Sequence, residues 1–482
     1  MEKLFKSANE GEEWFYKCFG KDETFDAVAR TIHLWEMPTL LLYINGLVDG
    51  DTILVLLTQM QGDNESIDTE ENEGERFLTF FPYHAVSIAT DKDDLLTAIL
   101  SGQGAFITPE GYAFIIDVRS YPGRQPEEPD IEKVIRGARD GFTETLLQNT
   151  ALIRRRLRTE DLRFEMHQTT INGRTDIAIG FMQGAASEEN LAYIRERLDK
   201  IRHDGLTMTD KSLEEFIFKQ GFHPMPFVRF TERPDICAAH MLEGHIAIIV
   251  DTSPSVILVP TTLFHHLQHA EEYRQAPLIG TLVRLIRFTI AALSLILLPL
   301  WYLLATRPEY LPDFLSYIGP KDIGEIPLLL QILMTDIGIE VLRMAAIHTP
   351  TPMSTAMGLV AAIVIGQVAI DVGLFTPEVV LYVAISAIFT FAIPSYELSI
   401  TTKVFRVCIL LSTAIFGASG FFVSIAVLFY YLCALKPMGA PYMWPAVPFF
   451  PQAMFRVLIR LPMTADAPRP YITHAPERDR TE

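Results

Sequence analysis

Residues 288–305 read FTIAALSLILLPLWYLLA, a stretch of 18 residues without a charged side chain between Arg287 and Arg307. Eighteen apolar residues are about the shortest run that spans the hydrocarbon core of a bilayer as a helix. Trp301 and Tyr302, near the end of the run, are side chains that favour the membrane interface. The stretch therefore predicts a membrane-spanning helix, and with it an integral membrane protein.

Three further runs without charges follow, over residues 357–370, 379–395 and 407–435. Core helices of soluble proteins rarely reach such lengths without a charged residue. We therefore predict an all-α, multi-pass transmembrane bundle over residues 281–450, with about four spans. A basic tail over residues 451–482 follows it.

Positive residues near the C-terminus are expected to orient these spans. They are Lys436, Arg456, Arg460, Arg469, Arg478 and Arg480. Because Lys and Arg favour the cytoplasmic side of a membrane, we expect both termini in the cytoplasm. The same arrangement places Lys403 and Arg406 in an outer loop, against that rule.

The excess of acidic residues lies in front of the apolar runs. The chain has a formal net charge of −19; residues 284–482 contain 13 basic and 13 acidic residues, so the whole excess belongs to residues 1–283. An acidic front part argues against nucleic-acid binding, which needs a surplus of Lys and Arg. Alternating strand and helix patterns there predict two cytoplasmic α/β subdomains, over residues 1–125 and, with a preceding helix, 126–280.

Residues 326–347 differ from the uncharged runs. Asp336, Glu340 and Arg343 fall on one face of an otherwise apolar helical pattern. One interpretation is an interfacial helix stabilised by a local Glu340–Arg343 pair. The other is a polar lining for a solute path through the membrane.

Other polar and small residues within the membrane half are candidates for the same path or for helix packing. Ionisable side chains within membrane segments are costly and are functional candidates by default. Glu397 follows a helix break at Pro394. The candidate ion path thus comprises Asp336, Glu340, Arg343, Gln367, Asp371 and Glu397. Gly417 and Gly420 are candidates for close helix packing.

The sequence shows no catalytic, cofactor or metal site. His265, His269 and Glu272 would share a helical face with ligand spacing, but a position just before the first span favours an interfacial role. The four cysteines have no metal-finger or disulfide spacing. No Walker or dinucleotide-binding glycine motif is present. We predict no enzyme activity, no cofactor and no metal.

Several segments resemble the A-subunit family of spore germinant receptors, the GerA family. They are RGARDGFTETLLQNTALIRRRL (136–157), TERPD (231–235), LEGHIAIIVDTSP (242–254), IGQVAIDVGLFTP (365–377), IPSYEL (393–398) and GAPYMWP (439–445). The first of them carries the family-motif residues Arg136, Gly137, Asp140, Gly141, Phe142 and Asn149. Ala138 stands where the family usually has Pro. Together with the departures in the 326–347 helix and at 264–273, this favours a stage V sporulation branch over a nutrient receptor.

The resemblance implies a multi-pass protein of the inner spore membrane that forms homo-oligomers. It implies an ion channel that releases monovalent cations during germination, with other membrane proteins of the germination machinery and membrane lipid as partners. Two alternatives remain open from the residues alone. One is a secondary transporter with a site at Pro394 and Glu397, and the other is a non-conducting membrane scaffold.

Overall fold

The chain folds into two compact units, Met1–Gln125 and Pro126–Glu482. The computed structural model describes residues 3–19, 27–35, 37–44, 48–60, 74, 77–78, 81–120, 132, 134, 136–157, 159, 161–169, 173–203, 205–218, 221–310, 318–320, 325–348, 358, 360, 362–462 and 469–473.

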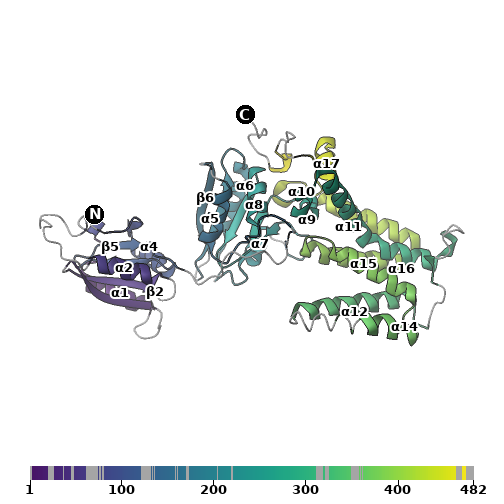
Figure 1. Ribbon diagram of the computed structural model, residues 1–482, viewed down its shortest axis with the longest axis horizontal. Coiled ribbons are helices and arrows are strands. Elements are labelled where there is room, and N and C mark those ends of the chain that lie inside the picture. The colour runs from purple at the N-terminus through teal and green to yellow at the C-terminus, as the bar shows by residue number, and fades with distance from the viewer. Residues whose placement is uncertain are drawn as a thin grey trace. The chain divides into compact units, whose positions relative to one another are not determined.

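The first unit is a five-stranded antiparallel sheet between two layers of helix (Figure 1). Its elements are α1 (Ala8–Phe19), β1 (Ala27–Leu34), β2 (Met37–Ile44), α2 (Gly50–Met60), β3 (Val86–Ile88), α4 (Lys92–Leu100), β4 (Gly104–Ile107) and β5 (Ala113–Ile116). Successive strand residues point to opposite faces, so Leu40 and Leu42 pack with α1 and α4 while Leu41 packs with α2. Apolar residues on both faces of β2 therefore produce the three layers.

The second unit begins with another five-stranded antiparallel sheet, which we call the second sheet domain. Its elements are α5 (Leu146–Arg156), β6 (Leu162–Thr169), β7 (Thr175–Met182), α6 (Glu188–Asp199), α7 (Thr209–Phe218), β8 (Arg229–Thr231), α8 (Pro234–Leu242), β9 (Ile246–Val250) and β10 (Val256–Val259). Ile177 and Ile179 pack with α6 and α7 on one face. Ala178 and Met182 pack with α5 and α8 on the other.

The two sheets have the same topology. Their strand orders are β1-β2-β4-β5-β3 and β6-β7-β9-β10-β8, which are identical when strands are numbered within each domain. A glycine at positive φ ends the equivalent helices: Gly102 (φ 83°) follows α4 and Gly244 (φ 92°) follows α8. At both helix ends the next residue donates back to the helix, Gln103 N to Ala98 O and His245 N to His240 O. Two α/β subdomains were predicted from the sequence, but this repeat was not.

Helices make up the rest of the second unit. They are α9 (Leu263–Leu267), α10 (Ala270–Arg274), α11 (Pro277–Thr306), η1 (Pro308–Tyr310), α12 (Leu328–His348), the π-helix η3 (Ala362–Val368), α14 (Ala369–Asp371), α15 (Pro377–Phe391), α16 (Tyr396–Ala434), η4 (Pro437–Gly439), α17 (Pro451–Leu458) and η5 (Tyr471–Thr473). Within the described part of the chain, α11 and α16 are long and apolar enough to cross a membrane. The run expected at 379–395 forms α15, which is shorter. The run expected at 357–370 lies partly outside the described residues.

Helix α16 reverses direction within its length. Gly417 has φ 64° and ψ −141°, a backbone conformation that is essentially restricted to glycine. The rings of Phe405 and Tyr431 lie 5.9 Å apart, whereas 26 residues of straight helix would separate them by about 39 Å. The run at 407–435, expected as one span, is thus the greater part of a helical hairpin. A Cβ added to Gly420 would lie 2.1 Å from Ser412 O, so this glycine lets the two halves of the hairpin approach.

Lys403 and Arg406 are not in a loop, contrary to the expected topology. Both lie in the first half of α16, and the Arg406 side chain is buried. The beginning of this helix contacts the second sheet domain, where Thr401 Oγ1 donates to Pro224 O at 2.5 Å. The conflict with the positive-inside rule arose because the expected loop is part of a helix whose charges have partners inside the bundle.

The C-terminal region also packs on the second sheet domain and its neighbouring helices. Arg460 donates to Tyr273 O at 2.6 Å, and Arg469 donates to Leu242 O at 3.1 Å.

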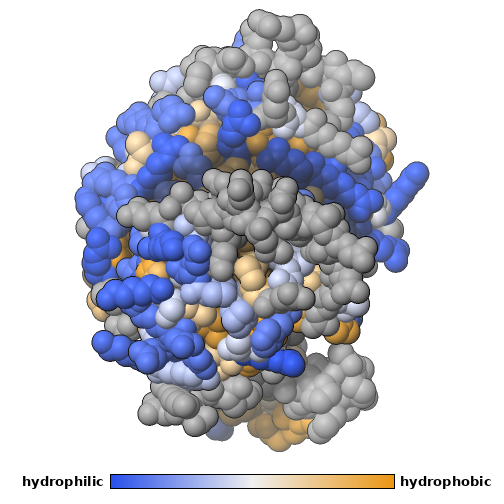
Figure 2. Space-filling model, turned by 90° about the vertical axis from the view of Figure 1, so that its left-hand side faces the viewer, coloured by the Kyte–Doolittle hydropathy of each residue, from blue (hydrophilic) through white to orange (hydrophobic). Residues whose placement is uncertain are grey.

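The surface shown in Figure 2 carries mainly hydrophilic side chains, with small apolar groups between them.

Candidate functional site

An ion pair between two helices lies at the centre of the helical bundle. Arg406 of α16 donates from Nη2 to Asp336 of α12, at 2.8 Å to Oδ1 and 3.0 Å to Oδ2. The Arg406 side chain is 1% exposed and the Asp336 side chain 13%. A charge at such depth is stable only with an opposite charge and further hydrogen bonds. Asp336 was a candidate from the sequence, but its partner Arg406 was not.

Two more helices supply those hydrogen bonds. Arg406 Nη1 donates to Ser386 Oγ at 2.8 Å and to Thr390 Oγ1 at 3.0 Å, both on α15. It also lies 3.3 Å from Ser294 O on α11. One guanidinium therefore joins α11, α12, α15 and α16.

A second pair lies one helical turn along α12. Glu340 accepts from Lys403 of α16 and from Arg343 of its own helix. The guanidinium of Arg343 lies over the Tyr396 ring, 5.2 Å from its centroid. The local Glu340–Arg343 pair considered from the sequence is thus present, together with a partner from another helix. We call Asp336, Glu340, Arg343, Lys403 and Arg406 the bundle charges.

The bundle charges comprise two carboxylates and three cations, so the group is not an acidic stripe. Lys403 and Arg406 were missed because they were assigned to a loop. Their spacing carried a usable signal: on a helix, residues at i and i+3 present two cations on one face, matching the two carboxylates at i and i+4 on α12.

Gln367 and Asp371 lie elsewhere. Gln367 Nε2 is 3.4 Å from Asp371 Oδ2, and both side chains are exposed. Among the described residues, no hydrogen bond or ion pair joins either of them to the bundle charges. The structure therefore does not bring all six sequence candidates together.

Glu397 lies at a joint between the second sheet domain and α16. Its Oε1 is 3.5 Å from Lys211 Nζ on α7, and the same ammonium group donates to Glu214 Oε2 at 2.5 Å. Burial raises the pKa of Glu214 to about 7, and the nearby Glu397 carboxylate acts in the same direction. Tyr431 OH lies 2.8 Å from His223 Nε2, which ties the second half of α16 to the same domain.

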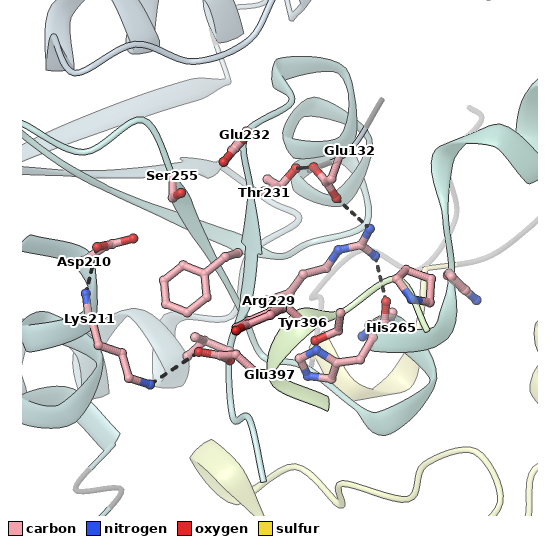
Figure 3. Close-up of a pocket in the computed structure, with 16 residues that line it drawn as sticks. Glu132, Asp210, Lys211, Arg229, Thr231, Glu232, Ser255, His265, Tyr396 and Glu397 are labelled. Atoms are coloured by element: carbon pink, nitrogen blue, oxygen red, sulfur yellow. Dashed lines mark hydrogen bonds and ion pairs between the residues drawn. The ribbon is translucent and has the colours of Figure 1, made fainter. Parts of the chain in front are cut away.

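A cavity of about 280 Å³ opens beside this joint (Figure 3). It is lined by the loop between α15 and α16 and the start of α16 on one side and by α7, β8 and α9 on the other. In Figure 3 the ammonium group of Lys211 points toward the adjacent Glu397 carboxylate, while Arg229 reaches toward Glu132 and His265.

The family-motif residues build the approach to α5. Asp140 accepts from Arg156 Nη2 at 2.6 Å, and Phe142 lies in the core beneath α5. The buried Asn149 side chain accepts from Thr143 N at 2.8 Å and donates to Thr143 O at 2.6 Å. These contacts fix the loop before the helix.

The motif glycines serve close packing, and the motif arginine is at the surface. Gly137 has φ 130°, and a Cβ there would overlap the Arg274 guanidinium. Gly141 is buried and Arg136 is exposed. The motif is a structural element of the second sheet domain.

The residues with metal-like spacing do not share one helix. Gln268 ends α9, and His269 is the N-cap of α10, so His265 and Glu272 lie on different helices. Glu272 pairs with Arg284 Nε at 2.8 Å and with Arg287. The expected common face was wrong because the chain turns at residues 268–269. Across the part of the chain that the structure describes, no group of three or more His, Cys, Asp or Glu side chains is placed to hold a metal ion.

Comparison with known proteins gives a match over nearly the whole chain. Residues 14–472 match a family described as Bacillus/Clostridium GerA spore germination protein. The chain is 44% identical over 481 residues to Stage V sporulation protein AF of Bacillus subtilis, covering 99% of this chain and 97% of that protein. It is 32% identical to Spore germination protein KA of B. subtilis, covering 92% and 83%.

Among solved structures, a match is found to the N-terminal domain of the A subunit of the Bacillus megaterium spore germinant receptor GerK3. The sequence identity is 26%, covering 54% of this chain and 96% of that one, with a TM-score of 0.22.

Proposed function

The chain belongs to the GerA family of spore germination proteins, and from that premise we propose that it is a membrane subunit of a spore germination complex. In this proposal it lies in the inner spore membrane, with the sheet domains in the cytoplasm. Copies assemble into a ring that releases monovalent cations during germination, together with other membrane proteins of the germination machinery.

The surface of the bundle supports a position in lipid. Ile415 (72% exposed), Phe416 (67%) and Phe422 (67%) of α16 turn outward from it. Contiguous exposed apolar surface of this kind mostly marks an interaction with lipid or another protein. Charged groups face inward instead, which is where membrane proteins keep them.

The single observation that supports conduction is the arrangement of the bundle charges. Glu340 is held by two cations, Lys403 and Arg343, and its side chain is 29% exposed, whereas the other carboxylate of the group, Asp336, is 13% exposed. In a ring of subunits, the more accessible Glu340 is the carboxylate that would attract a cation. The Lys403 ammonium group neutralises this carboxylate while the two are paired, so separation of the pair would open the path.

Paired substitutions in K⁺-loaded liposomes test this role. Glu340→Gln should lower K⁺ release because it removes the attracting charge. Lys403→Gln should raise it because it frees that carboxylate. Glu309→Gln is the matched control, since Glu309 pairs with Arg307 at the surface beyond α11.

Lower K⁺ release by Glu340→Gln and higher K⁺ release by Lys403→Gln, with assembly intact by native gel, support a cation path. Unchanged conduction in both variants overturns it, as does loss of conduction only when the complex fails to assemble.

A non-conducting scaffold is the second candidate. It is favoured by the extent of pairing, because Arg406 is paired with Asp336 and also donates to two hydroxyl groups of α15. Liposomes that hold assembled protein but release no K⁺ under any condition would favour this function. The transporter alternative relied on Glu397 at a membrane site, and its pairing with Lys211 of α7 places it at the joint instead.

A further inference from the structure

The first turns of α11 have their charges inside and their apolar side chains outside. Five apolar residues on one helical face are between 42% and 80% exposed: Leu278, Ile279, Leu282, Leu285 and Ile286. On the opposite face, Arg284 is buried and pairs with Glu272 of α10. A surface helix of a soluble protein has the reverse polarity, with its apolar face on the core. Exposed apolar surface of this kind marks a contact with lipid or another protein.

Helix α17 lies against this segment (Figure 1). Arg284 Nη1 donates to Arg456 O at 3.0 Å, and Arg460 N donates to Thr281 Oγ1 at 3.1 Å. A Cβ added to Gly280 would lie 2.8 Å from Arg460 Cδ, so this glycine allows the close approach. Two segments that are 172 residues apart in the chain thus form one surface.

Three phenylalanines extend the apolar side of this surface. Phe449 and Phe450, just before α17, and Phe455 within it are 68%, 38% and 51% exposed. Phe and Leu side chains form the apolar face of helices that lie in the interface plane of a membrane. We call residues 271–287 and 449–460, which hold all these groups, the collar.

The length of α11 indicates the depth of the collar. Its 30 residues measure about 45 Å, whereas the hydrocarbon core of a bilayer is about 30 Å thick and the bilayer with its headgroups about 40–45 Å. The uncharged run over residues 288–305 accounts for about 27 Å of hydrocarbon. The collar precedes this run, on the side of the second sheet domain, and so lies at the level of the headgroups.

The charge of the collar is positive. It contains five arginines and two glutamates, a net charge of +3, in a chain whose formal net charge is −19. Glu272 accepts from both Arg284 and Arg287, so two of these cations share one carboxylate. Basic clusters next to a membrane span attract anionic lipid headgroups.

We propose that the collar is a binding surface for anionic phospholipid, in the leaflet on the side of the second sheet domain. The inference rests on the proposed position in the membrane, and it adds which residues meet the lipid surface. The exposed apolar side chains enter the boundary of the acyl chains, while the arginines attract the phosphate groups. The collar of a second copy is a poorer occupant, because it would bring the same positive charge against this one.

Photo-crosslinking of the full-length protein tests the proposal. The protein is reconstituted in vesicles of equal parts phosphatidylglycerol and phosphatidylcholine, and adducts are identified by mass spectrometry. Phe455→p-benzoylphenylalanine is expected to form phospholipid adducts, with a several-fold excess of phosphatidylglycerol. Phe449→p-benzoylphenylalanine repeats the test outside the helix.

Two matched positions calibrate the experiment. The same substitution at Phe422, on the outward side of α16, should form lipid adducts from within the span. At Phe216, exposed on α7 of the second sheet domain, it should form none.

A charge substitution then tests the preference for anionic lipid. Arg456→Gln keeps the backbone carbonyl that accepts from Arg284 but removes one cation. It should lower the phosphatidylglycerol excess at position 455 by up to about fivefold. Arg307→Gln, at the other end of α11, is the matched control and should leave that excess unchanged.

Several results overturn the proposal. They are a crosslink from position 455 to a second copy, no lipid adduct at positions 455 and 449, equal adducts with both lipids, and an excess that Arg456→Gln does not lower. Position 422 separates this inference from the proposed function. If it forms lipid adducts while 455 and 449 do not, only the collar assignment is wrong. If it forms none either, the membrane position itself is wrong.

Discussion

The first and second sheet domains share one strand order but differ in what they are attached to. The first forms a compact unit of its own. The second contacts the bundle through Lys211, His223 and Pro224, which bond to side chains of α16. Apolar strands and helix caps thus set the layers in both copies, whereas a few polar groups on α7 and the loop after it connect the second copy to the helical bundle.

The largest expected effect comes from breaking the bundle ion pair. Asp336→Asn leaves Arg406 buried without its carboxylate, and loss of one partner of a buried pair typically costs about 3–5 kcal/mol. We expect the free energy of unfolding of the bundle to fall by this amount. Amide hydrogen exchange should then accelerate in β7 and β9, whose domain rests on α16, but not in β2 and β4.

Lys200→Gln is the control for this experiment. It breaks an exposed pair with Glu196 on α6, and pairs of this kind contribute little. If amide hydrogen exchange accelerated equally in both sheet domains after Asp336→Asn, the inference that only the second domain depends on the bundle would be wrong.

A smaller effect is expected from pH, and only in the second sheet domain. The pKa of Glu214 is raised from its ordinary value of 4.5 to about 7 by burial, and Glu397 and Glu215 add to the shift while Lys211 opposes it. The folded state then binds more protons than the unfolded state between these values, so stability falls as pH rises. The loss should be complete above pH 7 and amount to about 3 kcal/mol.

Domain-resolved hydrogen exchange from about pH 5 to about pH 8 measures this dependence. Glu214→Gln should remove this fall from the second sheet domain. It should leave the opposite dependence below about pH 6.5 that His240, His265 and His266 contribute, because burial lowers their pKa values. A fall of stability with rising pH that survives Glu214→Gln, or that is equally strong in the first domain, would assign it to other groups.

The smallest expected effect compares the two equivalent helix-ending glycines. Gly102→Ala and Gly244→Ala each place a Cβ at positive φ, which costs about 1 kcal/mol. At Gly244 the new Cβ would also lie 2.6 Å from Ala185 O, so Gly244→Ala should cost more. Urea unfolding of both variants gives the difference, and a larger loss for Gly102→Ala would contradict it.

The sequence predicted the layers of the fold better than the contacts of the site. Alternating and fully apolar strands are local signals, and both α/β subdomains were expected from them. The common strand order was not, because it depends on pairing between segments far apart in the chain. The family-motif segment was quoted from the sequence, but the Asn149 contacts that explain it require the folded loop.

The bundle charges show why the site was only half predicted. Asp336, Glu340 and Arg343 lie on one continuous helical pattern, so their common face could be read directly. Lys403 and Arg406 belong to another helix, 70 residues from Asp336 in the case of Arg406, and only packing brings them together. Gly417 was assigned to helix packing because a glycine among small residues does not reveal the sign of φ. Its role is to reverse the chain.

The reversal at Gly417 also bears on how the protein is made. The first half of α16 carries Lys403 and Arg406, and each such charge raises the cost of leaving the translocon for lipid by about 2.5–3.5 kcal/mol on insertion scales. The second half, residues 418–434, has no charged residue. The charged half is therefore the costly part of the hairpin. Its partners lie on α12 and α15, which precede α16 in the chain, so they are already made when Lys403 and Arg406 are synthesised.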